Sequence, residues 1–261
     1  MLTYFMVSEA ILRLFCRPVL VGSLNPSRDE WTVKTALTKA ERVFPNFRQA
    51  VQGKIVLDYG SGLGFQAIAM ALAGAKHVYA LDSWDRALAR ATELVAQHSL
   101  ADRVSVIASP DEVVERADVV LSQNSFEHFP DPGRELNAMA SLLAPGGKLY
   151  ICFGPPWYAP HGSHMSYFCR MPWVNVVFPE ETVMKVRADY RNDGAMRYVD
   201  VPGGLNRMSL AKWEALVANT GLNVEYSKYH AIKNLNVLAA IPALRELMVN
   251  DVTAILTIPL P

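Results

Sequence analysis

The sequence has no excess of either charge and contains little cysteine. In its 261 residues, 25 Lys and Arg side chains balance 25 Asp and Glu side chains, so the formal net charge is zero. Proteins that bind nucleic acid usually carry a basic excess, and we therefore expect no nucleic-acid partner. The cysteines form no C-x-x-C pair and are too few for a disulfide framework; they are Cys16, Cys152 and Cys169. This pattern favours a reducing, cytoplasmic location.

Long apolar runs are also absent. No stretch reaches the ~20 consecutive apolar residues that cross a membrane, so we expect no integral membrane segment. The first seventeen residues are largely apolar, but Glu9 and Arg13 interrupt them and no small-x-small cleavage site follows. This segment predicts an amphipathic helix rather than a secretory leader.

Residues 1–52 carry no strong motif and predict a helical cap. Ile11, Leu12, Leu14 and Phe15 fit one face of a first helix, and a second helix is expected near Glu30–Val43. Such a cap either packs on the core or covers a ligand as a lid.

From Lys54 onward, short apolar segments alternate with helical patterns. Ser83 is a good N-cap residue for one of these helices, and Ser209 for another. Strands are expected at 55–57, 77–81, 104–107, 117–121, 148–153, 223–229 and 252–258, and helices at 65–73, after 83, at 136–143, 210–217 and 242–248. This alternation predicts an α/β domain in which helices cover both faces of a largely parallel sheet.

An aromatic-rich insert interrupts the pattern after the fifth strand. Long irregular segments inside compact domains are usually functional, and aromatic side chains commonly line ligand pockets. We expect residues 154–207 to face the substrate, with Trp157, Tyr158 and Trp173 nearest to it. The same side chains would suit a contact between two copies of the chain, so a homo-oligomer stays open.

The segment Val56-Leu57-Asp58-Tyr59-Gly60-Ser61-Gly62-Leu63-Gly64 is the most informative one. A strand leads through a tight glycine turn into a helix, whose N-terminal N–H groups favour a nucleotide-like or carboxylate-bearing ligand. The phosphate-binding pattern G-x-x-x-x-G-K-[ST] is absent, and Phe65 stands where the dinucleotide fingerprint needs glycine. Asp82 ends the second strand, where its carboxylate can accept hydrogen bonds from both hydroxyls of a ribose.

Four motifs together resemble the class I S-adenosylmethionine-dependent methyltransferases. They are the V-L-D-Y-G-S-G-L-G turn, A-L-D-S at Ala80–Ser83, the segment L-S-Q-N-S-F-E-H-F-P-D-P from Leu121 to Pro132, and L-A-P-G-G at Leu143–Gly147. They occur in the family's order and spacing and cover roughly residues 54–153. The resemblance implies a Rossmann-like, doubly wound, seven-stranded and mostly parallel sheet with one antiparallel strand. The chain would then be a single domain with a helical cap (1–52), a cofactor-binding core (53–153), the insert (154–207) and the rest of the sheet (208–261).

The resemblance also implies S-adenosylmethionine as cofactor and a set of residues that would bind it. Gly60 and Gly62 would face the methionine moiety, and Asp58 would orient the turn or the ammonium group. Asp82 would bind the ribose hydroxyls. The adenine position falls on Ser109 or, with some preference, on Asp111. The remaining positions from these motifs are Ser61, Ser83, Asn124 and Ser125.

Three histidines are candidates for a general base, because the pKa of histidine lies near operating pH. His128 follows the fourth strand, where it equally well could orient the loop, whereas His164 and His161 lie in the insert, with His164 preferred. A metal site would need further Asp or Glu ligands from elsewhere, and we expect none.

These observations predict an enzyme that methylates a small molecule, at oxygen more readily than at nitrogen or carbon, with a histidine as base. Two other classes of function stay open. One is a nicotinamide-dependent oxidoreductase, against which Asp58 and Phe65 count, and the other is a non-catalytic protein that binds the cofactor or a partner.

Overall fold

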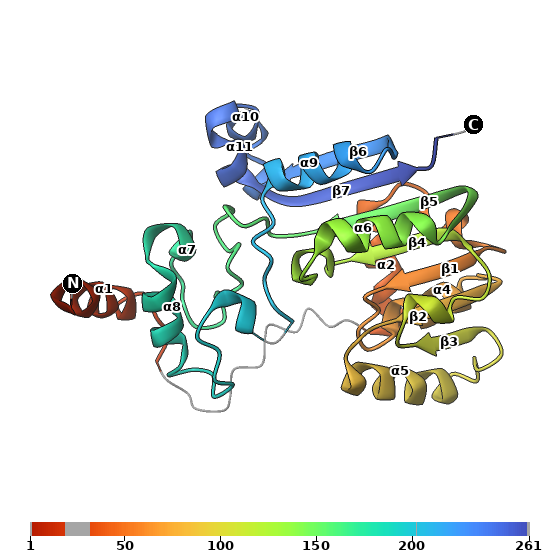
Figure 1. Ribbon diagram of the computed structural model, residues 1–261, viewed down its shortest axis with the longest axis horizontal. Coiled ribbons are helices and arrows are strands. Elements are labelled where there is room, and N and C mark those ends of the chain that lie inside the picture. The colour runs from red at the N-terminus through yellow and green to blue at the C-terminus, as the bar shows by residue number, and fades with distance from the viewer. Residues whose placement is uncertain (1, 19–31, 202, 260–261) are drawn as a thin grey trace.

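The computed structural model describes residues 2–18, 32–201 and 203–259 and shows a seven-stranded sheet within them (Figure 1). The strand order is β3-β2-β1-β4-β5-β7-β6. The strands are β1 (Ile55–Tyr59), β2 (His77–Leu81), β3 (Val104–Ile107), β4 (Ala117–Gln123), β5 (Leu143–Phe153), β6 (Asn223–Ala231) and β7 (Val249–Thr257). β1 to β5 pair in parallel, whereas β7 runs antiparallel to both β5 and β6. The expected architecture, with its single antiparallel strand, is thus confirmed.

Helices cover both faces of the sheet because its central strands are apolar on both sides; every residue of β1 is buried. One face packs against α2 (Val33–Val43), α3 (Phe47–Val51), α4 (Phe65–Leu72) and α5 (Asp85–Gln97). The other face packs against α6 (Pro132–Ser141) and α9 (Leu210–Asn219). The short helices α10 (Asn236–Ala239) and α11 (Pro242–Met248) lie between β6 and β7 in the chain.

The N-terminal helix and the insert together form a second hydrophobic core. It is built from α1 (Leu2–Arg13), α7 (Val174–Val177), α8 (Glu180–Arg187) and the 3₁₀ turn η3 (Tyr198–Asp200). We call this part, residues 2–18, 155–201 and 203–207, the insert lobe. In Figure 1 it lies at the end of the molecule opposite β3. Leu12 of α1 is fully buried in this core beside Phe168 and Met184, so the first helix covers the insert rather than the sheet.

Several local expectations need correction. Ser83 is not the N-cap of the following helix: α5 begins at Asp85, its N-cap residue is Trp84, and the Asp82 carboxylate accepts the Trp84 N–H at 2.9 Å. The helix expected at 136–143 begins earlier, at Pro132, where Asp131 caps it. The insert is also more regular than expected, since α8 lies within it. The start expected for the second helix at Glu30 lies outside the described residues, and α2 begins at Val33.

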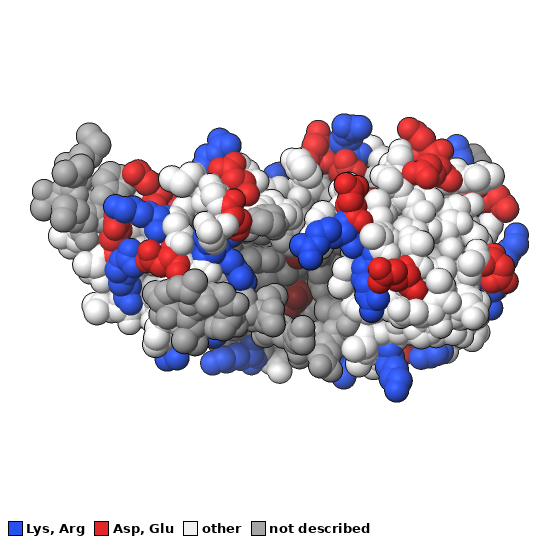
Figure 2. All heavy atoms as spheres, turned by 90° about the horizontal axis from the view of Figure 1, so that it is seen from below, with Lys and Arg blue, Asp and Glu red and all other residues white. Residues whose placement is uncertain are grey.

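Within the described part of the chain, no helix is long and apolar enough to cross a membrane. Positive and negative side chains alternate over the face shown in Figure 2, and the described residues form no continuous patch of one sign there.

Candidate active site

The glycine turn lies at the carboxyl end of β1, beside the end of β2. The N–H groups of Gly60 and Ser61 both donate to the Leu81 carbonyl, at 2.9 and 2.8 Å. Gly60 and Gly62 have φ angles of +82° and +52°, which residues with a Cβ rarely adopt. A Cβ at Gly62 would have no atom within 4 Å, so the turn is open on that side. This opening is where a ligand could approach the backbone closely.

Asp82 holds the turn from the end of β2. Its Oδ2 accepts the Gly62 N–H at 2.8 Å, while its Oδ1 accepts the Trp84 N–H. Each carboxylate oxygen can accept more than one hydrogen bond, so both retain capacity for hydroxyl donors. The half-buried carboxylate is therefore fixed at the rim of the opening, in the place expected for a ribose.

Asp58 lies beneath the turn and is 3% exposed. Its carboxyl group accepts a hydrogen bond from the Ala67 N–H in the first turn of α4, which orients that helix against the strand. Burial, together with the nearby charge of Asp82, raises the pKa of Asp58 to about 7. Its Oδ2 has no protein partner. A cationic group placed here would stabilise the ionised carboxylate.

The end of β4 meets the turn from the other side. Ser125 Oγ donates to the Gly60 carbonyl at 2.9 Å, and the Asn124 N–H donates to the Cys152 carbonyl at 2.8 Å. Asn124 has a φ of +55° and its side chain is exposed. The structure thus brings Asn124 and Ser125 to the edge of the sheet that holds Gly60, as the sequence motifs predict.

His128 and His164 come together although they are 36 positions apart in the sequence. Their rings are 5.3 Å apart between centroids and nearly perpendicular, at 89°. His128 ends the 3₁₀ turn η2 (Phe126–His128), and its Nδ1 lies 2.7 Å from the Gly204 carbonyl. A carbonyl oxygen only accepts hydrogen bonds, so Nδ1 carries the hydrogen and, in the neutral ring, Nε2 has the free lone pair.

His164 lies in the insert and is partly buried, like His128. Burial, and to a smaller extent the neighbouring His128, lower the pKa of His164 to about 4. Its Nε2 is buried without a hydrogen-bond partner. His161 differs, since its ring is exposed; only its carbonyl takes part, accepting the His164 N–H at 2.9 Å.

The comparisons with known proteins agree with this geometry. The family described as methyltransferase domain matches residues 34–227, well over half of the chain. The chain belongs to the class I S-adenosylmethionine-dependent methyltransferases. It is 28% identical over 210 residues to an uncharacterized methyltransferase of Mycobacterium leprae, a match that covers 78% of this chain and 72% of that one. The expected enzyme class and cofactor are thus confirmed, and the oxidoreductase and non-catalytic alternatives are set aside.

Three further proteins are similar to this chain over part of its length. A ubiquinone biosynthesis O-methyltransferase of Marinobacter nauticus is 34% identical over 40% of this chain and 45% of its own length. A histone-arginine methyltransferase of Anopheles gambiae is 40% identical over 49% of this chain and 21% of its own length. The crystal structure of an S-adenosylmethionine-dependent methyltransferase from Mesorhizobium loti superimposes with a TM-score of 0.53 at 16% identity, over 84% of this chain and 95% of that one. The last likeness concerns the fold alone.

The residues of this methyltransferase fit the cofactor at the glycine turn. Several buried polar atoms in the turn and in the elements that meet there have no protein partner. They lie at the ends of β1 and β4, in the turn itself and at the start of α4: Asp58 Oδ2, Gln123 Oε1, Ser61 Oγ and the Gln66 amide. Buried polar groups are normally hydrogen-bonded, so these atoms indicate a polar ligand. Together with the opening at Gly62, they suit a molecule that bears an ammonium group and hydroxyls.

Two residues that we expect to bind the cofactor, Ser83 and Asp111, have exposed side chains. Ser83 is exposed between β2 and α5. Asp111 is exposed on the 3₁₀ turn η1 (Pro110–Glu112), where its N–H bonds to Ser109 Oγ at 3.3 Å. Glu112 folds back and accepts the N–H groups of Ala108 and Ser109, both at 2.9 Å. Glu112 therefore shapes this loop, while the Asp111 side chain stays exposed.

The three expected substrate residues have different environments. Trp157 packs into the insert-lobe core against Tyr198, with ring centroids 4.9 Å apart, and the Arg207 guanidinium lies 5.3 Å from its centroid. Tyr158 is exposed beside it. Trp173 precedes α7 with a φ of +57°, and its buried indole N–H has no protein partner.

Sequence reasoning missed two residues that shape the site. Asn206 is the first: its side-chain amide donates to the carbonyls of Phe126 and Phe129, at 2.8 and 2.9 Å, and so clamps the turn that ends in His128. Gln66 is the second, a buried amide in the first turn of α4. No motif marks Asn206, because its partners are 77 and 80 positions away; Gln66 could have been found from its place directly after the glycine turn.

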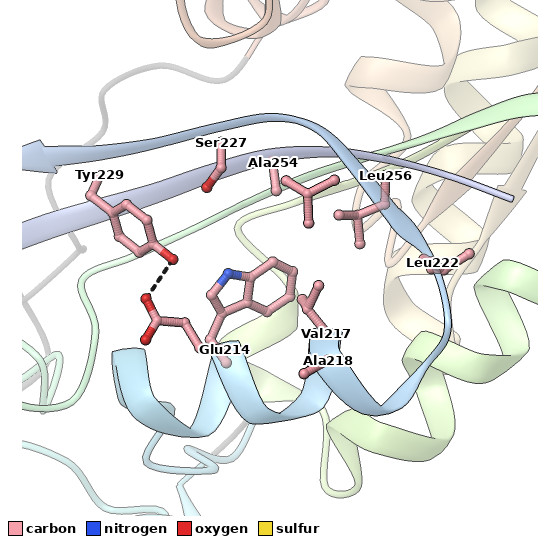
Figure 3. Close-up of a pocket in the computed structure, with 10 residues that line it drawn as sticks. Glu214, Val217, Ala218, Leu222, Ser227, Tyr229, Ala254 and Leu256 are labelled. Carbon is pink, nitrogen blue, oxygen red and sulfur yellow. Dashed lines mark hydrogen bonds between the residues drawn. The ribbon is translucent and has the colours of Figure 1, made fainter. Parts of the chain in front are cut away.

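A pocket of about 330 Å³ lies elsewhere, between α9 and the β6–β7 pair (Figure 3). Its walls are mostly apolar, with Glu214 and Tyr229 hydrogen-bonded to each other at 2.8 Å at one end. Trp213, which lines the pocket, is almost fully buried, so the pocket exposes little of the indole. None of the expected site residues lines it.

Proposed function

We propose that this enzyme transfers a methyl group from S-adenosylmethionine to an oxygen atom of a small-molecule acceptor, in the cytoplasm, with His128 as general base. The hydrogen bond from Nδ1 of His128 to the Gly204 carbonyl supports this most directly, because it leaves Nε2 able to accept a proton.

Each part of the site would then have a defined task. The bound cofactor supplies an electrophilic methyl group. Asp82 would hold the ribose hydroxyls, and Gly60, Gly62 and Asp58 would receive the methionine part at the turn. His128 Nε2 would take the proton of the acceptor hydroxyl as its oxygen attacks. Because the low pKa of His164 keeps that ring neutral, no second positive charge opposes the protonation of His128. Alignment of the acceptor oxygen with the methyl group would supply most of the rate enhancement.

Two observations favour a small acceptor. The insert, which contributes His164 to the histidine pair, is rich in aromatic side chains, and the side chain of Tyr158 is exposed. The chain has no net charge and mixes both signs on the face in Figure 2, which gives a nucleic acid little to bind. The alignment with the histone-arginine enzyme covers only 49% of this chain and 21% of that protein, so it carries no argument for a protein acceptor.

The cysteine content agrees with the proposed compartment. The three cysteines in 261 residues form no C-x-x-C pair and are too few for a disulfide framework, as is usual for proteins of reducing compartments.

The cofactor part is tested by calorimetry with S-adenosylmethionine and S-adenosylhomocysteine, with NADH as a control ligand. Asp82→Ala removes the acceptor of the ribose hydroxyls, and hydrogen bonds to charged groups contribute about 1.5–3 kcal/mol each, so we expect affinity to fall at least about tenfold. Asp102→Ala, an exposed carboxylate on the loop before β3, is the matched control and should bind as wild type does. Unchanged affinity in Asp82→Ala would show that Asp82 does not hold the cofactor.

The base is tested by S-adenosylhomocysteine formation with a panel of phenols, alcohols, amines and carboxylic acids. Removal of a general base costs about 10²–10⁴-fold in rate, so His128→Ala should lower kcat by that factor, leave cofactor affinity unchanged and regain activity with added imidazole. His98→Ala, at an exposed histidine after α5, is the control. Full activity of His128→Ala, or turnover of amines alone, would contradict the proposal.

A further inference from the structure

Two of the three cysteines lie opposite each other where the chain leaves α1 and meets the insert. Cys16 and Cys169 form an isolated antiparallel backbone bridge. The N–H groups of Arg17 and Arg170 donate across this bridge, at 2.8 and 2.9 Å, to the carbonyls of the residues that precede the opposite cysteine. These two hydrogen bonds flank the cysteines, which therefore occupy a non-hydrogen-bonded position of the antiparallel pair.

This position brings the two cysteine side chains together. In an antiparallel pair, residues directly opposite each other place their side chains on the same face. At a non-hydrogen-bonded position their Cα atoms are about 4.5 Å apart, closer than at a hydrogen-bonded position. A disulfide bond joins residues whose Cα atoms are about 4.4–6.8 Å apart. The backbone of the two segments therefore already has a spacing that a disulfide bond can span.

The two thiols also interact with each other. Burial, and to a smaller extent the charge and the hydrogen bond of Cys169, raise the pKa of Cys16 to about 11. Burial also raises the pKa of Cys169, and hydrogen bonds, one of them from Cys16, partly offset this. The sulfur atoms are therefore within hydrogen-bonding reach of each other. Cys16 Sγ can also donate to the Leu12 carbonyl at 3.3 Å, but a thiol is a weak donor, so loss of this bond would oppose a cross-link little.

We propose that Cys16 and Cys169 form a reversible disulfide bond when the enzyme meets a low-molecular-mass disulfide such as glutathione disulfide. Cys16 is partly buried whereas Cys169 is 1% exposed, so the oxidant reaches Cys16 first. The Cys16 thiolate attacks one sulfur of glutathione disulfide, forms a mixed disulfide and releases one glutathione thiolate. The Cys169 thiolate then attacks the Cys16 sulfur and releases the second glutathione thiolate. The two thiol protons pass to the two glutathiones, so two cysteine thiols are oxidised and one glutathione disulfide is reduced.

The third cysteine has a different environment. Cys152 lies on β5 and packs in the core between the sheet and α2, α3 and α4, where the Thr253 hydroxyl lies 3.8 Å from its sulfur. Cys169 belongs instead to the core of the insert lobe, with Cys16 packed against it. Cys152 is therefore an internal control. A reversible bond also agrees with the proposed compartment, because cytosolic disulfides are usually transient or redox-sensing.

The cross-link would fasten the end of α1 to the insert lobe. Both segments are already in place in the reduced protein, since the Tyr190 hydroxyl donates to the Arg17 carbonyl and the Tyr190 ring stacks on Phe168 with centroids 4.9 Å apart. Cys16 and Cys169 are 153 positions apart in the sequence. A disulfide that closes so long a loop restricts the unfolded chain strongly, so oxidation should stabilise the fold.

Treatment of the reduced full chain with glutathione disulfide tests the bond, at about pH 8.5 because a higher pH increases the thiolate fraction. Thiols are counted by alkylation after denaturation, and the intact mass is measured. Wild type should pass from three titratable thiols to one, lose about 2 Da as a monomer and regain all three thiols with dithiothreitol. The urea midpoint of unfolding should be higher for the oxidised than for the reduced protein.

Three alanine variants assign the bond to its cysteines. Cys152→Ala is the matched control and should lose two thiols as wild type does. Cys169→Ala should stop at the mixed disulfide, with the added mass of one glutathionyl group, and Cys16→Ala should keep both remaining thiols. Circular dichroism shows whether each variant is folded, and Cys16→Ala, at the less buried position, serves alone if Cys169→Ala is not.

Three results would overturn the proposal. One is a wild type that keeps its three thiols, and another is a wild type that stops at a glutathione adduct, because the two sulfur atoms would then not come into bonding contact. The third is a loss of two thiols in Cys16→Ala or a covalent dimer of wild type, because the bond would then join other cysteines.

Discussion

Gly60 and Gly62 are two positions in one turn where the same substitution should have different effects. Both have positive φ, and alanine there costs about 1–2 kcal/mol in the left-handed region. They differ in the space around the missing side chain. A Cβ at Gly60 would lie 2.7 Å from both Cβ and Oγ of Ser125, whereas a Cβ at Gly62 would meet nothing within 4 Å. Overpacking of this kind costs about 1–3 kcal/mol.

We therefore expect Gly60→Ala to lower the free energy of unfolding by about 2–5 kcal/mol and Gly62→Ala by about 1–2 kcal/mol. The loss of unfolded-state entropy on replacing glycine is common to both and cancels in the difference. Urea titration of the ligand-free protein, followed by circular dichroism, measures both values. Gly62→Ala should in addition weaken S-adenosylmethionine binding, because its methyl group fills the side of the turn left open.

A double variant separates the clash from the backbone strain. Ser125→Gly removes both atoms that the new Cβ of Gly60→Ala would meet, so the combined variant should be more stable than the sum of the single effects by about 1 kcal/mol or more. Additive effects, or equal losses for Gly60→Ala and Gly62→Ala, would refute the steric reasoning.

Three further predictions concern buried charge. The pKa of Asp58 is about 7 in the folded state against an ordinary value of 3.8, so the free energy of unfolding of wild type should fall as pH rises from about 4 to 7. Asp58→Asn should remove up to about 4 kcal/mol of this pH dependence, measured by urea titration at pH 4 and pH 8. Parallel pH profiles of wild type and variant would contradict this prediction. The pKa of His164 is lowered to about 4 from 6.5, so stability should instead fall as pH drops through this range, and the melting temperature of His164→Gln should fall less between pH 7 and 5. Arg187→Ala leaves Asp193 without its guanidinium partner and should lower the free energy of unfolding by about 2–3 kcal/mol, less than for a fully buried pair. Arg197→Ala, at an exposed pair, should leave the free energy of unfolding nearly unchanged, and equal effects of the two substitutions would count against this distinction.

The elements around the cofactor could be predicted because their signals are local. The strands β2 and β3 occur at their expected residues, since each is a short apolar run beside a turn or helix end. The glycine turn combines its whole signal in nine adjacent residues, and the ends of parallel strands meet at one edge, which brings Asp82 to Gly62.

The acceptor side could not be predicted in the same way. The contact between His128 and His164, and the clamp by Asn206, join positions tens of residues apart, and no spacing rule encodes them. The aromatic residues of the insert were expected to face a substrate, but Trp157 also forms part of a hydrophobic core with Tyr198. Composition shows that such side chains are present without showing which of them pack together.

The packing of α1 has a consequence for synthesis of the chain. Its partners on and after α8 lie 174 and 176 positions further along the sequence, as in the contacts of Ser8 with Thr182 and of Arg13 with Asp189. A ribosome that adds about 5–20 residues per second needs roughly 10–35 s to reach them. During that interval α1 exposes Leu12 of its inner face as well as Val7 and Ile11, which remain exposed in the folded chain. The helix α1 thus waits longer for its packing partner than α2, which packs against α4, and chaperones that shield apolar helices would have correspondingly longer access to α1.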